Sequence, residues 1–196
     1  METRDRILEA ATELYLEGGL PALSMRKVAA MADISAPAIY RHFDSKEALI
    51  TAVCADGYRL FGQYLFRGLE GGSPLERLRL TGLGYLEFGL DHPGYYRVLF
   101  MTNASEHGLS EWMENHREKV SPTFQFLVDR IRECVEAGVI EADELRVLAA
   151  EIWSHTHGMV SLWLIGELGS DLGSANDFRR FYTTAMDRHL RGLRPQ

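Results

Sequence analysis

Leu23-Ser-Met-Arg-Lys-Val-Ala-Ala-Met-Ala-Asp-Ile-Ser-Ala-Pro-Ala-Ile-Tyr-Arg-His-Phe-Asp-Ser-Lys-Glu-Ala-Leu49 is the stretch that decides the fold. It predicts two short helices joined by a tight turn, with a third helix beginning at its end. Ser24 and Ser35 can each cap a helix by accepting a hydrogen bond from a backbone N–H of the first turn. Pro37 fits a first helical turn, where a missing N–H costs little. Asp33 lies at the turn, where a short polar side chain tolerates a left-handed backbone.

The second short helix has a narrow apolar edge, made by Ile39 and Phe43 at helical spacing. The residues left on its outside are small or suited to binding phosphate: Ala36, Pro37, Ala38, Tyr40, Arg41 and His42. A short helix of this kind suits the major groove of DNA. Asp44 and Glu47 predict a capping-box-like start for the next helix, with both carboxylates near its positive end.

The segment from Ile39 to Leu49 resembles the signature of the TetR family of bacterial transcriptional repressors. In that family a tyrosine and a histidine on the recognition helix, then Phe, then a lysine opening the next helix recur at this spacing. The resemblance implies a helix-turn-helix protein that binds operator DNA. Asp33 stands where a glycine is usual, and Pro37 stands where a threonine is common. Both fit the backbone, so these departures bear on the operator sequence more than on binding itself.

Three residues are expected to contact phosphate. The hydroxyl of Tyr40 and the imidazole of His42 can reach phosphate oxygens without reading sequence. Lys46 opens a helix, where its charge opposes the helix dipole unless phosphate lies beside it. The resemblance points to the same three residues. The alternative is a solvated helix edge.

Base contacts are expected near the start of the first short helix. Arg26 is suited to guanine O6 and N7, or it contacts phosphate or pairs with an acidic neighbour. Ser35, Ala36 and Pro37 would face the groove floor, where small groups touch thymine methyls, and Lys27 contacts phosphate or is solvated. The whole set of predicted DNA-binding residues is Ser24, Arg26, Lys27, Ser35, Ala36, Pro37, Tyr40, Arg41, His42 and Lys46.

Composition supports a packed globule, because 46% of the 196 residues are hydrophobic. The net charge is −7, yet cations outnumber anions between Ser24 and Lys46, so only this face can approach DNA. There is no apolar run of membrane-spanning length and no signal-peptide core, which predicts a cytoplasmic protein without a membrane partner. Cys54 and Cys134 are expected to be reduced core thiols.

The remaining pattern predicts an all-α chain with no credible strand. Gly18-Gly19 and Gly71-Gly72 should end helices, and Ser73-Pro74 and Ser174 should begin them. Helices are expected over residues 3–17, 45–69, 73–90, 95–100, 110–119, 121–138, 143–168 and 174–193, with loops at 102–108 and 170–174. We expect residues 1–48 to form the helix-turn-helix domain and residues 49–196 to form an effector-binding and dimerisation domain.

Aromatic residues are frequent after the N-terminal quarter, and apolar pockets between helices are common ligand sites in helical bundles. The resemblance implies a small-molecule effector pocket in this region. Any single aromatic residue is more often part of the core. The candidate ligand-binding residues are Tyr85, Phe88, Tyr95, Phe100, Phe124, Trp153, His157 and Trp163.

The stretch from Ile152 to Val160 resembles the Trp–His–Gly motif of one TetR C-terminal domain type. Trp153 and His157 are four residues apart and therefore share a helix face. His157 either hydrogen-bonds an effector or acts as a pH-sensitive latch, or it is a satisfied buried histidine that orients the core. Gly158 costs about 1 kcal/mol against alanine in a helix interior, which predicts a close helix crossing.

A homodimer is expected through the last two helices, which in the family pair with their counterparts in a four-helix bundle. A dimer is also required physically, because one short recognition helix contacts too few bases. A two-fold pair reads a palindromic stretch of double-stranded operator DNA. We therefore expect a ligand-responsive repressor that a small apolar or amphipathic effector releases.

Two other functions are alternatives to a DNA-binding repressor. A helical-bundle enzyme or metal-binding protein would use Glu151, His155 and His157. Glu151 and His155 lie four residues apart and could bind a metal, but no third ligand stands at convincing spacing. The sequence has no nucleophile-elbow, zincin or phosphate-loop motif, so no catalytic residue, metal or cofactor is expected. A ligand-binding protein that has lost DNA binding is disfavoured by the intact Tyr40 and His42.

Overall fold

The computed structural model describes residues 2–101 and 122–195. Within these residues every regular element is helical, which confirms the all-α prediction. The helix expected at 110–119 and the loop expected at 102–108 lie outside the described residues. No helix in the described ranges combines the length and the apolar character needed to cross a membrane.

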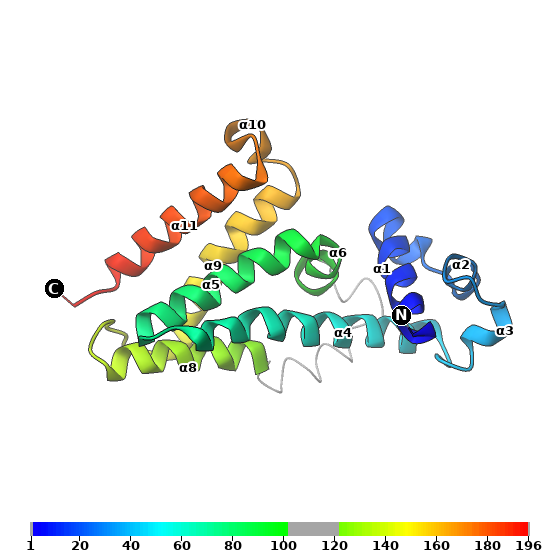
Figure 1. Cartoon of the computed structure of the whole chain (residues 1–196), viewed down its shortest axis with the longest axis horizontal. Helices are drawn as coiled ribbons and strands as arrows, with labels where there is room; N and C mark the ends of the chain where they lie inside the picture. The colour runs from blue at the N-terminus through cyan, green and yellow to red at the C-terminus, as the bar shows by residue number, and fades with distance from the viewer. Residues whose placement is uncertain (1, 102–121, 196) are drawn as a thin grey trace. The chain divides into compact units, whose positions relative to one another are not determined.

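The helices follow one another along the chain as labelled in Figure 1. In order they are α1 (Thr3–Ala22), α2 (Met25–Met31), α3 (Ala36–Ile39), α4 (Lys46–Phe66), the 3₁₀ turn η1 (Arg67–Glu70), α5 (Pro74–Asp91), α6 (Pro93–Tyr96), the π-helical η2 (Arg97–Met101), α8 (Pro122–Glu136), α9 (Leu145–Leu164), α10 (Gly169–Leu172) and α11 (Ala175–Gly192).

Glycine and serine positions set several of these boundaries, as predicted. The backbone of α1 leaves helical geometry at Gly18 and Gly19, where Gly19 has a φ of 65°. The backbone N–H of Glu76 donates to Ser73 Oγ at 3.2 Å, and that of Asp177 donates to Ser174 Oγ at 3.2 Å. The prediction of a loop over residues 170–174 was wrong, because the short helix α10 occupies most of this segment.

The chain forms two compact units. Unit 1 comprises Met1–Arg59 and Gly94–Lys119, and unit 2 comprises Leu60–Pro93 and Val120–Gln196. Helix α4 contributes its first part to unit 1 and its last part to unit 2.

In unit 1, α1 packs on α2 and α2 packs on α3. The side chains of Ile7, Val28 and Leu49 are fully buried there. Segment α6 packs closely on α4 in the same unit, because a Cβ at Gly57 would lie 2.8 Å from Tyr95 Cδ1. The hydroxyl of Tyr95 donates to Asp56 Oδ2 at 2.8 Å, which fixes this contact.

In unit 2, α5 packs against η1, α8, α9 and α11. Helices α9 and α11 form an antiparallel pair joined through α10 (Figure 1). The crossing of α5 with the end of α4 is very close, because a Cβ at Gly84 would lie 2.3 Å from the carbonyl oxygen of Tyr64. Phe88 and Tyr182 are fully buried and account for much of the apolar area that stabilises this unit.

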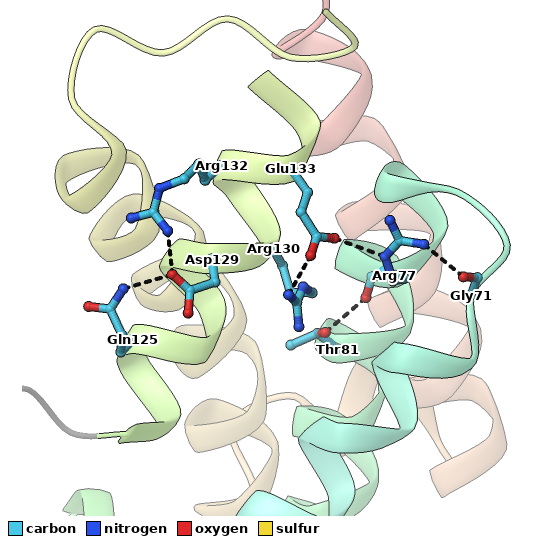
Figure 2. A network of polar contacts seen from close by, with 8 residues as sticks. All are labelled: Gly71, Arg77, Thr81, Gln125, Asp129, Arg130, Arg132 and Glu133. Atoms are coloured by element: carbon cyan, nitrogen blue, oxygen red, sulfur yellow. Dashed lines mark hydrogen bonds and ion pairs between the residues drawn. The ribbon is translucent and has the colours of Figure 1, made fainter. Parts of the chain in front are cut away.

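A polar network joins the start of α5 to α8 (Figure 2). Arg77 donates from Nε to Glu133 Oε2 at 2.8 Å and from Nη1 to the carbonyl oxygen of Gly71 at 3.1 Å. Arg130 pairs with the other oxygen of Glu133 and lies over the ring of Phe126 at 4.5 Å. The two guanidinium groups hold the pKa of the Glu133 carboxyl below its ordinary value, with Arg77 as the main cause.

Both cysteines are buried free thiols, as the sequence predicted. Burial raises the pKa of Cys54 to about 12 and is the main cause that raises the pKa of Cys134 to about 11. Both side chains therefore stay protonated and unreactive at neutral pH.

The close helix crossing predicted at Gly158 is not present among the described residues. A Cβ built at Gly158 meets no described atom within 4 Å. Packing against the described residues therefore does not require a glycine at this position.

Gly84→Ala should lower the free energy of unfolding by about 2 kcal/mol, because the added methyl group overlaps backbone that cannot move away. Gly192→Ala is the matched control, since a Cβ there meets no described atom within 4 Å. Urea unfolding followed by circular dichroism measures both. Equal stabilities of the two variants would contradict the close crossing.

Candidate nucleic-acid interface and ligand region

The helix-turn-helix segment is built by local capping, as its sequence predicted. Ser24 Oγ accepts from the backbone N–H of Lys27 at 3.3 Å, and Ser35 Oγ accepts from that of Ala38 at 3.2 Å. Asp33 has a φ of 53° and is the one non-glycine residue with positive φ among the described residues. The turn between α2 and α3 therefore depends on a left-handed residue at this position.

The predicted inner and outer faces of the second short helix are confirmed. Ile39 and Phe43 are 0% and 6% exposed, whereas Tyr40 is 52% exposed. Arg41 and His42 are exposed as well. The two buried anchors therefore direct the intervening side chains to the outside of unit 1.

One detail of this helix differs from expectation. Helix α3 ends at Ile39, so Tyr40, Arg41 and His42 lie in the turn that follows it. The backbone N–H of Arg41 donates to Ala38 O at 3.1 Å, and that of His42 donates to Ile39 O at 2.9 Å. These bonds span three residues, so the chain tightens after Ile39 while keeping its helical sense.

The prediction that Asp44 caps the helix containing Glu47 was wrong, because Ser45 is the capping residue. Helix α4 begins at Lys46, and Ser45 Oγ accepts from the backbone N–H of Ala48 at 3.1 Å. Asp44 stands one residue too early to be the cap. Glu47 remains in the first turn, where hydrogen bonds from its own backbone N–H and from the Ser45 hydroxyl lower its pKa.

Several arginines of unit 2 are ion-paired, whereas cations of the helix-turn-helix segment are not. In unit 2 a group of arginines pairs with carboxylates: Arg77, Arg79, Arg130, Arg132, Arg179 and Arg180. In unit 1, Arg26, Lys27 and Arg41 form no ion pair with any described residue. The possibility that Arg26 pairs with an acidic neighbour therefore finds no support within the described chain, and its cation is available to an external anion.

Arg4 is not among the DNA-binding residues predicted from the sequence. Its guanidinium carbon lies 5.6 Å from the centroid of the Phe43 ring, which places a further cation beside the turn that holds Tyr40 and His42. A signal was present, because the positions three and four residues later are Ile7 and Leu8 and offer no carboxylate. The contact with Phe43 itself depends on tertiary packing.

Four of the candidate ligand-binding residues form a connected group in unit 2. The Tyr85 hydroxyl and His157 Nδ1 are 3.0 Å apart. The ring of Trp153 lies 5.8 Å from that of His157 and 6.2 Å from that of Phe124, measured between centroids. Burial lowers the pKa of His157, so a polar pair lies within an aromatic group.

The other four candidates occupy different surroundings. Phe88 is fully buried and lies 5.0 Å from Phe61. Trp163 stacks on Phe178, with centroids 4.7 Å apart and rings almost parallel at 4°. Tyr95 and Phe100 belong to unit 1. The eight residues therefore do not form one group within the described units.

The rival set of Glu151, His155 and His157 is divided between two surroundings. His157 faces Tyr85, whereas His155 stacks on His189 with centroids 4.7 Å apart. In the part of the chain that the structure describes, no three His, Cys, Asp or Glu side chains are placed to hold a metal ion.

A capped helix-turn-helix with unpaired cations, followed by a larger helical unit, defines a regulator of the helix-turn-helix class. Residues 7–53 match the family described as bacterial regulatory proteins, tetR family. Residues 78–188 match the tetracyclin repressor-like C-terminal domain. The chain belongs to the tetR family, whose members are transcriptional regulators and not enzymes.

Curated relatives match part of the chain. The HTH-type transcriptional repressor KstR of Rhodococcus jostii is 41% identical over 81 residues, which are 40% of this chain and 37% of the relative. KstR2 of Mycolicibacterium smegmatis is 34% identical over 103 residues, which are 52% of this chain and 49% of the relative. The matched region thus spans less than half of either relative.

The fold extends over the whole chain. The structure of KstR2 of Mycobacterium tuberculosis, described as a ketosteroid transcriptional regulator, superposes with a TM-score of 0.73 at 21% identity. The superposition covers 100% of this chain and 96% of that one. At this identity the likeness establishes the fold.

Replacing Asp33 tests the strain in the turn. Asp33→Ala should be less stable than Asp33→Gly by about 1 kcal/mol, because only glycine adopts positive φ without a steric penalty. Thermal unfolding of the two variants measures the difference. Indistinguishable midpoints would show that the left-handed backbone at this position does not limit stability.

Proposed function

We propose that this protein is a transcriptional repressor that binds a palindromic operator as a homodimer and is released by a small apolar or amphipathic effector. The observation that carries the DNA-binding part is the exposure of Tyr40, Arg41 and His42 next to two buried anchors. Hydroxyl, guanidinium and imidazole groups in such a turn suit phosphate and base edges. The functional division that we propose places DNA binding in residues 1–48 and regulation in residues 49–196.

The charge distribution supports binding to a limited stretch of DNA. The chain has a net charge of −7, and in unit 2 many arginines are neutralised by carboxylates. In unit 1, Arg4, Arg26, Lys27 and Arg41 have no carboxylate partner among the described residues. Non-specific affinity should therefore be low, and specific contacts and dimerisation should supply most of the binding.

Dimerisation through the last two helices is supported by apolar side chains that the single chain leaves exposed. Leu162 on α9 and Phe181 on α11 are 42% and 38% exposed, and Ile165, next to the end of α9, is 55% exposed. Large apolar groups gathered on one helix pair favour association with a second copy. A dimer gives the two recognition helices the separation that a palindrome requires.

The proposed effector acts through the larger unit. Tyr85 and His157 supply a polar pair among aromatic rings, which suits a small ligand that is mostly apolar and carries one polar group. Helix α4 belongs to both units, so a ligand that prefers a different placement of α4 changes the separation of the two heads. Release then follows because the ligand favours the state that does not fit the operator. As a DNA-binding repressor, the protein should act in the cytoplasm.

Arg26→Ala combined with Tyr40→Ala should abolish operator binding without unfolding the protein. The operator is obtained by selecting fragments of the source genome that the purified protein binds, and affinity is measured by fluorescence anisotropy. Arg132→Ala is the matched control, because Arg132 lies on α8 and pairs with Asp129. Retained affinity in the double variant would refute the assigned interface.

Lys46→Ala should weaken binding to all sequences alike. It should also reduce the slope of log affinity against log salt by about one, because a single phosphate contact is lost. Titrations at several salt concentrations give the slope for the variant and for the unaltered protein. An unchanged slope would place Lys46 away from the phosphate backbone.

Leu162→Glu should convert the dimer to a monomer and reduce operator affinity, because a charge is placed in the apolar contact. Leu69→Glu is the control, since Leu69 is 54% exposed in η1 and lies outside α9 and α11. Analytical ultracentrifugation measures the oligomeric state. A dimeric Leu162→Glu protein would exclude this face.

A further inference from the structure

Two histidines of unit 2 stack on each other between α9 and α11. The rings of His155 and His189 have centroids 4.7 Å apart and planes inclined by 29°. His155 Nδ1 and His189 Nε2 are both buried and have no hydrogen-bond partner among the described residues. The pair therefore occupies a packing position in which neither buried nitrogen is satisfied.

Few charged groups oppose or support a proton at this pair. From α9, Glu151 Oε1 lies 3.8 Å from His189 Nε2, and the Glu151 side chain is 57% exposed. From α5, Arg79 is paired with Asp187 of α11 at 2.7 Å. Among the described residues, the carboxylate at ion-pair distance from the stack is therefore that of Glu151, which faces His189 and is mostly solvated.

The remaining charged neighbours on α11 are Arg188 and Arg191, which are exposed. They add positive charge to the same helix and do not supply a partner for an imidazolium. Helix α10 meets the opposite end of α11, next to Asp177. The positive charge of a proton on either ring would therefore be poorly neutralised by nearby carboxylates.

We infer that the His155–His189 stack is an acid-sensitive switch in the packing of α9 against α11. When both rings are neutral, the stack holds the two helices together. A proton taken up by one ring places a charge on a buried nitrogen beside the second ring, and protonation of both would place two cations at stacking distance. Acid therefore weakens the packing of α9 against α11 at the histidine stack.

The direction of the effect follows from the pKa of His189. Burial lowers this pKa below the ordinary value of 6.5, His155 lowers it further, and Glu151 partly opposes the shift. Below that ordinary value the unfolded chain binds a proton more readily than the folded chain. The contribution of the pair to stability is therefore present above the unfolded pKa and is lost as the pH falls through the folded pKa.

The consequence for regulation rests on the proposed function. If the dimer forms through α9 and α11, loosening this helix pair weakens dimerisation, and the paired heads are lost with it. Acidification would then reduce operator binding without any effector. The stack itself is tested without DNA, so its failure is distinguishable from a failure of the proposed function.

The test compares full-length protein with His189→Phe and His155→Phe, which keep an aromatic ring but cannot take up a proton. Urea unfolding midpoints are measured at about pH 7.5 and about pH 5.5, on either side of the ordinary histidine pKa. We expect the fall in midpoint on acidification to be roughly halved in either variant. Burial also lowers the pKa of His92 and His157, which accounts for the remaining fall.

Phe66→Leu is the control, because Phe66 is exposed and carries no titratable group, so the substitution should leave the pH dependence of stability unchanged. A full fall in midpoint in both phenylalanine variants would overturn the inference. If neither variant folds, the His189 ring is titrated by NMR in the unaltered protein, and a midpoint at or above 6.5 would overturn it equally. Sedimentation at the same two pH values then tests the link to dimerisation.

Discussion

The burial of Ile39 and Phe43, which are 0% and 6% exposed, fixes the direction of every side chain between them. Three residues separate the two anchors, so one turn of chain is held at both ends by the core of unit 1. The side chains of Tyr40, Arg41 and His42 therefore point away from the core and are exposed. The proposed DNA contacts are thus a consequence of apolar packing, and the turn at Asp33 sets where that packing begins.

The same logic extends to charge. In unit 2, arginines such as Arg77 and Arg179 are held by carboxylates and join helices, so their charge stabilises the fold and attracts little from outside. Arg26 and Arg41 have no such partner among the described residues. The proposed binding of a polyanion by an acidic protein therefore rests on the helix-turn-helix segment, where these cations remain available to an external anion.

Much of this could be predicted because it is local. The caps at Ser24, Ser35 and Ser73, the break at Gly19 and the left-handed Asp33 each depend on a few neighbouring residues. The cap at Ser45 was misassigned to Asp44 because both side chains can cap and the sequence does not fix the first residue of the helix. The pairing of Arg4 with Phe43 and of His155 with His189 required tertiary packing, which residue spacing alone does not provide. The same limit applies to the hydrogen bond that the hydroxyl of Tyr95 donates to Asp56 within unit 1.

Helix α4 is held tightly in each unit by a glycine contact. At Gly57, within unit 1, there is no room for a Cβ beside Tyr95, and at Gly84, within unit 2, there is none beside the backbone of Tyr64. Close contacts of this kind have few alternative arrangements, because overlapping atoms cannot slide by small amounts. A structural change at either end of α4 should therefore shift the protein between discrete conformations. We do not expect a continuous series of small adjustments. The proposed regulation by an effector, and the proposed effect of acid at the histidine stack, would then act by changing which of these states is populated.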